Sequence, residues 1–254
     1  MRLGTATRGG EGARRFLAAP LPSDPDRIVD LTAVEAERLR KLGEGDPPRL
    51  AQALVPSSLR EILEGGPRAW HRAEQTLAYA EKWAQRGPLT ETLAPGLHQV
   101  RLMPCLPRPL SLRLPDGSFG DRFAIGGPDC RLPWTPGLEL RPTLAVAGQA
   151  GGLPGGFLLA VMAGGATLLG PWLHRSIDLR GTLFFDGPRS SRQTPLDPWS
   201  DLILPRLRPG EVLLLPPPIW EAPEFLPGDR IHLRAPFGGL SFTLARAGTH
   251  PTLQ

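Results

Sequence analysis

The segments RLRPGEVLLL (206–215) and LPGDRIHLRAPFGGLSFTLAR (226–246) share a pattern that predicts strands in the last part of this chain. In each segment a Pro-Gly pair precedes an acidic residue, Glu211 or Asp229, and an apolar run follows. Proline fixes φ and glycine supplies the unusual backbone of a tight turn, so each pair predicts a turn that opens a strand. Taken alone, two such turns can also be unrelated, and the rest of the chain must decide.

Upstream of these segments, short apolar runs alternate with turns from about Leu112 onward. The uncharged segment 153–173 is long enough to cross a bilayer, but its paired glycines favour two buried strands joined by a turn. The glycine-rich segment 148–156 lacks the Lys-Ser/Thr end of a phosphate loop and predicts a tight strand connection. The expected strands are 123–125, 144–147, 157–162, 177–185, 211–215, 230–235 and 240–245.

The first part of the chain predicts short strands at 1–6, 15–18 and 27–31, followed by helices. A weak signal predicts the start of a helix at Thr32. A clearer signal predicts a second helix from Ser58, where Ser58 and Glu61 match a capping box, and this helix is expected to end at Gly65–Gly66. After Pro67, apolar residues recur at helical spacing and predict a face that packs on the leading strands. These residues are Trp70, Ala73, Leu77, Ala80 and Ala84.

A proline-rich passage at 88–110 separates this part from the strands that follow. We therefore expect a mostly β (α+β) protein: a small α/β N-terminal domain at 1–100 and a β-rich domain at 101–254. The 30 glycines and 31 prolines, together with 41% hydrophobic residues, fit many turns between short strands better than disorder.

The charge composition argues against a nucleic-acid binder. The net charge is +4, and all the basic residues except Lys41 and Lys82 are arginines, which GC-rich coding or a hot habitat explains. The arginines are scattered along the chain and form no basic patch in the sequence.

The N-terminal residues 1–15 contain no apolar signal segment, and Cys105 and Cys130 lack metal or redox spacing. We expect a cytoplasmic protein without a membrane segment.

Four passages, taken in order, resemble the fumarylacetoacetate hydrolase family. They are MRLGTATRGG with RIVDL and SSLREILEGG, then GSFGDRFAIGGPDCRLPW with LELRPTLAVAGQAG, then LLGPWLHRSIDLRGTLFFDGPRSSRQT (168–194), and then the two closing Pro-Gly-acid strands. The resemblance implies a mixed β-roll body behind a small leading domain. Its bacterial relatives include isomerases, decarboxylases, hydratases and acylpyruvases of 2-oxo acids, which commonly form homodimers.

The resemblance also implies a divalent cation, usually Mg²⁺ and sometimes Ca²⁺, held by an early Asp, a Glu-x-Glu and a further Asp. In this chain the Glu-x-Glu positions fall on Arg141 and Thr143, and the further Asp falls on Met162. No Asp or Glu occurs between Leu140 and Ile177, so a shift of the alignment does not restore the acids; Glu139 alone is near. We expect a degenerate member without a metal cofactor.

Other catalytic groups of the family are also missing from the sequence. No lysine follows Lys82 to take the place of the family's catalytic lysine, and no histidine lies between 101 and 131 for its His-Glu pair. His174 and His232 remain, and each is more often a packing or surface residue than a catalyst. No GxSxG motif is present.

We therefore expect a non-catalytic or chemically altered relative that binds a small carboxylate or a protein partner. The cleft candidates are Arg122, Glu139, Trp172 and Arg192. An arginine that faces the former metal site can bind a carboxylate directly, although surface arginines are commoner.

An active hydrolase, isomerase or decarboxylase is the alternative, similar to a 2-hydroxyhepta-2,4-diene-1,7-dioate isomerase. Its site would be rebuilt from Glu139, Asp121 or the acids of a partner subunit. A homodimer is expected from the resemblance, and a nucleic-acid partner is not expected.

Overall fold

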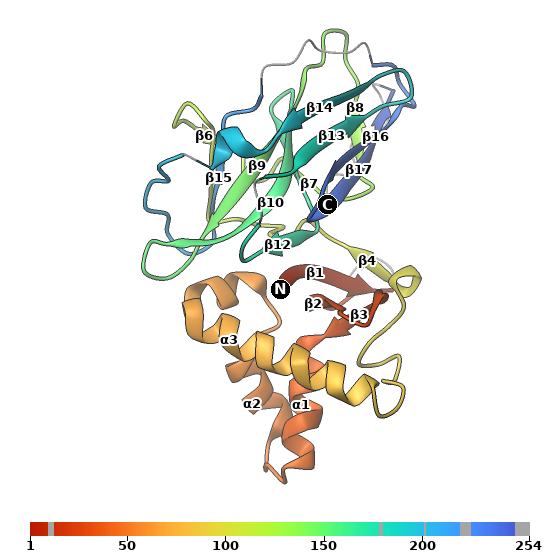
Figure 1. Ribbon diagram of the computed structural model, residues 1–254, viewed down its shortest axis with the longest axis vertical. Helices are drawn as coiled ribbons and strands as arrows, with labels where there is room; N and C mark the ends of the chain where they lie inside the picture. The colour runs from red at the N-terminus through yellow and green to blue at the C-terminus, as the bar shows by residue number, and fades with distance from the viewer. Residues whose placement is uncertain (10–12, 178–179, 201, 219–224, 247–254) are drawn as a thin grey trace.

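Two β-sheets and a group of helices make up residues 1–9, 13–177, 180–200, 202–218 and 225–246, the part of the chain that the computed structural model describes (Figure 1). The expectation of a mostly β chain is confirmed. The helices are α1 (Leu31–Lys41), α2 (Pro47–Leu54) and α3 (Leu59–Ala84), with short 3₁₀ turns at Leu97–Gln99 and Asp197–Trp199.

The larger sheet runs through the whole described molecule in the order β3-β2-β1-β12-β10-β9-β15-β5-β6, with β4 beside β1, and with β11 beside β10 and β7. Its strands are β1 (Arg2–Arg8), β2 (Arg15–Leu21), β3 (Asp24–Asp30), β4 (Val100–Leu102), β5 (Ser111–Arg113), β6 (Phe119–Gly120), β7 (Ile125–Gly126), β9 (Leu140–Gly148), β10 (Pro154–Ala163), β11 (Ala166–Leu169), β12 (Trp172–His174) and β15 (Glu211–Leu214).

The smaller sheet faces β9 and β10 in the body and has the order β14-β13-β16-β17-β8. Its strands are β8 (Arg131–Pro133), β13 (Thr182–Asp186), β14 (Ser191–Pro195), β16 (Arg230–Ala235) and β17 (Gly238–Ala245). Apolar side chains of the two sheets form one core between them, which includes Leu144 and Val146 on β9 and Phe185 and Phe242 on the smaller sheet. The body is therefore a sandwich.

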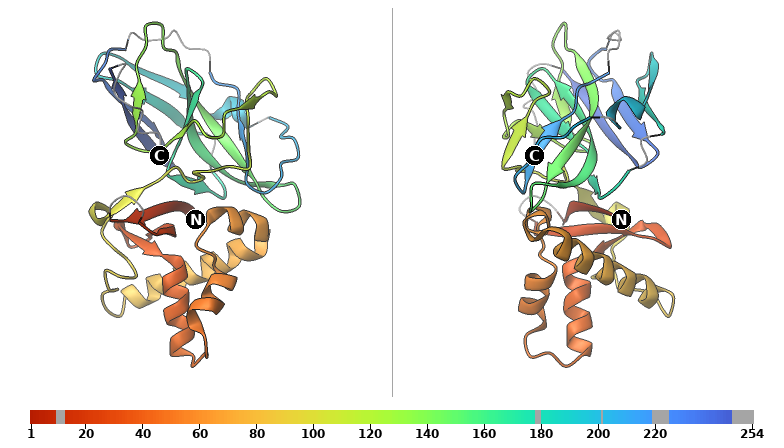
Figure 2. Two further views of the ribbon diagram at one scale, coloured as in Figure 1. Left: turned by 180° about the vertical axis from the view of Figure 1, so that it is seen from behind. Right: turned by 60° about the vertical axis from the view of Figure 1, so that its left-hand side comes forward.

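The helices lie on the side of β1–β3 that is turned away from the body (Figures 1 and 2). The apolar stripe of α3 packs in a second core with residues of the leading strands such as Leu3 and Leu17, as its spacing predicts. Trp70 and Ala73 on this stripe are fully buried. The backbone leaves helical geometry at Gly66, where φ is 61°, so the predicted break at Gly65–Gly66 is a kink.

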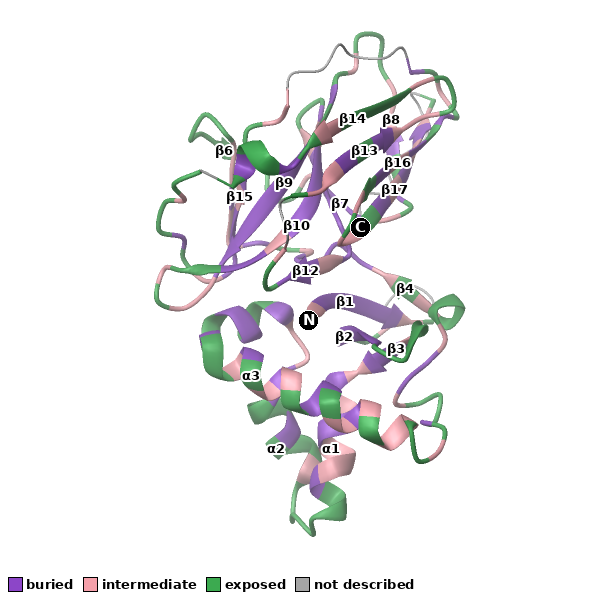
Figure 3. Cartoon of the chain, in the orientation of Figure 1, coloured by how far each residue is buried: buried purple, intermediate pink, exposed green. Residues whose placement is uncertain are grey.

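Strands β9 and β10 are covered on both faces (Figure 3). Ala145 and Ala147 face the core shared with the helices, whereas Leu144 and Val146 face the core between the sheets. A strand that is buried on both faces needs a continuous apolar sequence, which explains the uncharged run at 153–173. The connection from β9 to β10 is 149–153, shorter than the glycine-rich connection that the sequence predicts, because Pro154–Gly156 belong to β10; Gly164–Gly165 connects β10 to β11 as predicted. No helix in the described ranges is long and apolar enough to cross a membrane.

The structure also differs from the sequence predictions at Ser58, at Phe123 and at 177–185. Ser58 precedes α3 as predicted, but its side chain makes no capping hydrogen bond. Phe123 lies in an exposed turn, and the expected strand at 123–125 is reduced to Ile125–Gly126. The strand expected at 177–185 forms at Thr182–Asp186, and residues 178–179 lie outside the described residues.

The two halves of the chain share a sheet, because β1 pairs antiparallel with β12 through Arg2–His174 and Leu3–Leu173. The core beneath α3 likewise draws residues from both halves, for example Leu17 and Leu158. The division at residue 100 stays a prediction. The continuous sheet fixes the position of β9 and β10 relative to the leading strands. The candidate site lies at the end of these two strands that carries Arg141 and Met162.

Candidate functional site

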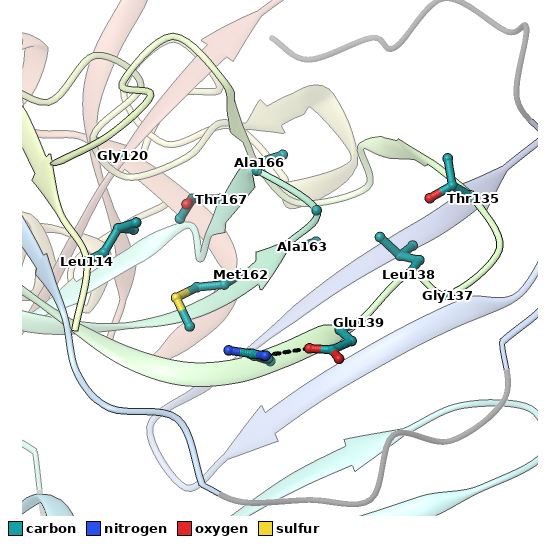
Figure 4. Close-up of a pocket in the computed structure, with 13 residues that line it drawn as sticks. Leu114, Gly120, Thr135, Gly137, Leu138, Glu139, Met162, Ala163, Ala166 and Thr167 are labelled. Carbon is teal, nitrogen blue, oxygen red and sulfur yellow. Dashed lines mark hydrogen bonds and ion pairs between the residues drawn. The ribbon is translucent and has the colours of Figure 1, made fainter. Parts of the chain in front are cut away.

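A pocket of about 400 Å³ opens at the end of β9, β10 and β11, and we call it the β9–β11 pocket (Figure 4). This volume lies within the range of small-molecule sites. Apolar and glycine residues make up most of the wall, and four side chains with polar groups join them. The lining residues are Leu114, Gly120, Thr135, Gly137, Leu138, Glu139, Arg141, Met162, Ala163, Gly164, Gly165, Ala166 and Thr167.

The three positions that the resemblance assigns to metal-binding acids lie on one face of one strand pair. Arg141 on β9 is the direct cross-strand partner of Met162 on β10, and Thr143 is the partner of Ala160. Side chains alternate along a strand, so Arg141 and Thr143 share a face. Arg141 and Met162 line the pocket. Thr143 is fully buried and donates its hydroxyl to the carbonyl of Leu215 at 2.7 Å, so it does not reach the pocket.

Glu139 and Arg141 form an ion pair at the pocket, drawn as the dashed line in Figure 4. Nε and Nη2 of Arg141 both donate to Oε2 of Glu139, at 3.0 and 2.5 Å. The side chains are 58% and 60% exposed, so water screens the pair. Nη1 of Arg141 has no hydrogen-bond partner among the described residues, which leaves it available to a ligand.

The apolar part of the pocket comes from three elements. Met162 is supplied by β10, Leu114 by the segment between β5 and β6, and Leu138 by the turn before β9. In Figure 4, Met162 lies between Leu114 and Glu139. A charged guanidinium beside an apolar wall suits a ligand with an anionic end and an apolar body.

Three residues considered for this site from the sequence lie outside the pocket. Arg122 donates from Nη1 to the carbonyl of Leu110 at 2.9 Å and covers the ring of Phe123. Asp121 accepts from the amide of Phe123 at 2.8 Å, which closes a local turn. Arg192 is exposed on β14 of the smaller sheet. None of these three lines the β9–β11 pocket.

Trp172 lies on β12, away from the β9–β11 pocket, and borders a cavity of only about 10 Å³. Its ring is covered by the guanidinium of Arg2 at 5.5 Å.

His174, two residues further, packs edge-on against Phe237 with ring centres 5.4 Å apart. Burial, followed by the charges of Arg2 and the N-terminal amine, lowers the pKa of His174 to about 4. His232 shares a hydrogen bond with Ser241 at 2.8 Å. Both histidines therefore have packing partners.

The pocket combines a guanidinium, a carboxylate paired with it, threonine hydroxyls and a thioether. Within the described ranges, no three His, Cys, Asp or Glu residues cluster as a metal site would require. Hard cations such as Mg²⁺ prefer several oxygen ligands, and a thioether is a soft ligand.

Several lining residues were not identified from the sequence. Leu114 and Leu138 come from loops, whose position in space leaves no periodic signal. The Gly164–Gly165 turn was identified as a strand connection, and both glycines have positive φ, 53° and 91°. The short connection from β10 to β11 brings this turn to the pocket.

No family model matches this chain, and no curated protein matches it in sequence. Solved structures do match over nearly the whole chain. Maleylpyruvate hydrolase from Sphingobium sp. SYK-6 has a TM-score of 0.64 at 17% identity, covering 97% of this chain and 100% of its own. A second structure of that enzyme, in complex with manganese(II) and pyruvate, has a TM-score of 0.62 at 18% identity, covering 97% and 99%.

A 2-hydroxyhepta-2,4-diene-1,7-dioate isomerase from Mycobacterium marinum matches with a TM-score of 0.58 at 14% identity, covering 98% of this chain and 100% of its own. These similarities establish the fold. The fumarylacetoacetate hydrolase-like fold expected from the four sequence passages is confirmed.

Proposed function

We propose that this chain, built on the fumarylacetoacetate hydrolase-like fold, binds a small carboxylate in the β9–β11 pocket without a metal ion and catalyses no oxo-acid cleavage there. The observation that carries the proposal is the position of Arg141, which lines the pocket directly opposite Met162 on the neighbouring strand. One similar structure was solved with manganese(II) and pyruvate. In this chain, the guanidinium of Arg141 would attract the carboxylate of the ligand.

The present ion pair of Arg141 does not prevent this role. Exposed ion pairs contribute about 0–1 kcal/mol, because water competes for both partners. A ligand carboxylate can accept charge-assisted hydrogen bonds from the same guanidinium, and burial of its apolar body in the pocket adds to them. Exchange of Glu139 for the ligand therefore costs little, and Nη1 of Arg141, which has no partner among the described residues, offers a first contact.

The residues at the former acid positions do not fit a divalent cation. Arg141 carries a positive charge, Met162 offers only sulfur, and the hydroxyl of Thr143 is already donated to a carbonyl. By Coulomb's law, a dication about 5 Å from a guanidinium is opposed by roughly 2 kcal/mol in water and roughly 7 kcal/mol at an effective dielectric of 20. Glu139 would have to overcome this repulsion while paired with Arg141.

The remainder of the pocket supports an apolar body on the ligand. Leu114, Leu138 and Met162 cover the wall beside the ion pair. Each buried methylene group of a ligand contributes about 0.8 kcal/mol. A branched carboxylate such as 4-methyl-2-oxopentanoate should therefore bind more tightly than pyruvate, by about tenfold or more.

Calorimetric titration of these two acids into the purified chain tests the proposal. Arg141→Met, which keeps an unbranched though shorter side chain and removes the charge, should weaken binding at least tenfold. Glu139→Gln should strengthen binding by a few fold, because it removes the internal competitor for Arg141. Arg122→Met is the matched control, since this arginine lies outside the pocket, and it should leave the affinity unchanged.

Equal affinities of the wild type and Arg141→Met would contradict the assignment of the guanidinium. Magnesium-dependent turnover of an acylpyruvate by the wild-type chain would contradict the proposal as a whole and would support the alternative of a working oxo-acid enzyme.

A further inference from the structure

A second pocket, of about 270 Å³, lies between the leading strands, the loop before α3 and the segment after β4. We call it the arginine pocket. It shares no residue with the β9–β11 pocket. Its lining residues are Thr5, Arg15, Ser57, Ser58, Leu59, Arg60, Cys105, Leu106, Pro107 and Arg108.

Three arginines from three different segments converge on this pocket, and none of its described lining residues is acidic. Arg15 comes from β2, Arg60 from the start of α3 and Arg108 from the segment between β4 and β5. Arg60 is held by Glu64 at 2.9 Å. The side chains of Arg15 and Arg108 have no hydrogen bond or ion pair with any residue in the described part of the chain. Like charges gathered around a cavity produce a field that attracts an anion.

Hydroxyl groups add neutral donors to the same wall. Ser58 occupies the position that caps α3, but its hydroxyl makes no capping bond. Ser57 is half-buried beside it, and neither serine side chain has a hydrogen-bond partner within the described ranges. The hydroxyl of Thr5, by contrast, is donated to the carbonyl of Cys105 at 2.8 Å. Two hydroxyls in the pocket therefore remain available.

The remaining polar group of the pocket does not oppose an anion. Burial raises the pKa of the Cys105 thiol to about 12, so the sulfur is uncharged at neutral pH. Leu59, Leu106 and Pro107 supply an apolar part of the wall. Such a wall gives room for an organic group beside the anionic one.

We propose that the arginine pocket binds a small phosphate monoester through its phosphate group. A phosphate presents acceptor oxygens in several directions, and this suits guanidinium and hydroxyl donors that arrive from three segments of the chain. A planar carboxylate can be satisfied by a single arginine fork. The absence of an acidic lining residue also excludes a cation as the preferred ligand of the described pocket.

Calorimetric titrations with glycerol 3-phosphate and with inorganic phosphate, in a chloride buffer, test this assignment. We expect saturable binding of glycerol 3-phosphate that weakens as sodium chloride is raised. Arg15→Ala and Arg108→Ala should each weaken it at least tenfold. Both side chains are exposed and make no hydrogen bond or ion pair with a described residue, so these variants should fold; Ser58→Ala tests the hydroxyl separately. Arg49→Ala, an exposed arginine outside the pocket, is the control.

Comparison of the two affinities shows whether the ligand is a phosphate monoester or the free phosphate ion. Tighter binding of glycerol 3-phosphate supports a monoester, whereas equal or tighter binding of inorganic phosphate would overturn the monoester and leave the free ion as the ligand. No saturable binding of either probe, or equal losses in Arg49→Ala and Arg108→Ala, would overturn the site. Because Arg141→Met leaves this pocket intact, failure of the carboxylate proposal would not affect these results.

Discussion

Glu211 and Asp229 show how single residues build this fold. Each follows a Pro-Gly pair, and its carboxylate accepts a hydrogen bond at 2.8 Å from the amide three residues earlier, Arg208 or Leu226. Gly210 has φ 78° and Gly228 has φ 96°, as such a turn requires. Burial alone would raise the pKa of Glu211, but bonds from the Arg208 amide, Ser111 and Arg113 hold it below its usual value. The two turns are equivalent, as their sequences indicated.

The buried carboxylate of Asp229 should contribute measurably to stability. Asp229→Asn keeps the shape of the side chain but removes the charge that strengthens its bonds to the Leu226 amide and to Arg189. We expect a loss of about 1–3 kcal/mol in the free energy of unfolding, measured with urea. Asp121→Asn is the control, because this exposed aspartate also accepts a hydrogen bond from a nearby backbone amide, that of Phe123. Similar losses in both variants would show that burial is not the cause.

His174 should make the protein sensitive to acid. Its pKa in the folded chain, about 4, lies below the value of about 6.5 in the unfolded chain. The unfolded chain therefore binds more protons between these values, so the stabilising contribution is complete above about pH 6.5 and is lost as the pH falls toward 4.

This contribution can be isolated with His174→Leu. Between pH 7 and pH 4.5, the free energy of unfolding of the wild type should fall by up to about 2 kcal/mol more than that of the variant. Urea unfolding at the two pH values measures the difference. Identical pH dependence of the two proteins would mean that His174 is protonated equally in the folded and unfolded states.

At the scale of the elements, α3 kinks at Gly66, immediately before Pro67. Gly66 has φ 61° and ψ −147°, a region open almost only to glycine. A β-carbon there would also lie 3.2 Å from Cβ of Ala150, in the loop between β9 and β10. The amide of Ala150 donates to the carbonyl of Leu63 at 2.9 Å, so the kink joins the helix to the body.

Gly66→Ala should therefore destabilise the chain by about 1–3 kcal/mol. Gly87→Ala serves as the control, because φ there is not positive and a β-carbon added to it would meet no atom within 4 Å; it should change stability by less than about 0.5 kcal/mol. Thermal unfolding followed by circular dichroism measures both. A neutral Gly66→Ala variant would show that the helix is able to straighten.

The elements that the sequence predicted well are those with long apolar runs or specific turn residues. Strands β9, β10, β16 and β17 combine both signals. Strands β6 and β7 have only two residues each, too few for any periodic pattern, and their pairing comes from the surrounding fold. The capping box predicted at Ser58 does not form, because the sequence motif alone does not fix the orientation of the serine side chain, which makes no capping hydrogen bond.

At the scale of the whole molecule, the candidate site depends on contacts between distant segments. The family resemblance placed Arg141 and Met162 at two positions of metal-binding acids, and the pairing of β9 with β10 makes these residues direct neighbours. Leu114 and Leu138 reach the pocket through loops, which no spacing rule could foresee. Arg122, Trp172 and Arg192 belong to passages that resemble the family, but the fold places them elsewhere. The homodimer and the cytoplasmic location stay predictions.

The role of Arg141 in place of a metal ion is tested most directly by titrating 4-methyl-2-oxopentanoate into the wild-type chain in EDTA, and again with Mg²⁺ or Mn²⁺ in excess. We expect saturable binding in EDTA, with the same affinity when either cation is present. Binding that requires Mg²⁺ or Mn²⁺, and that disappears in EDTA, would contradict it.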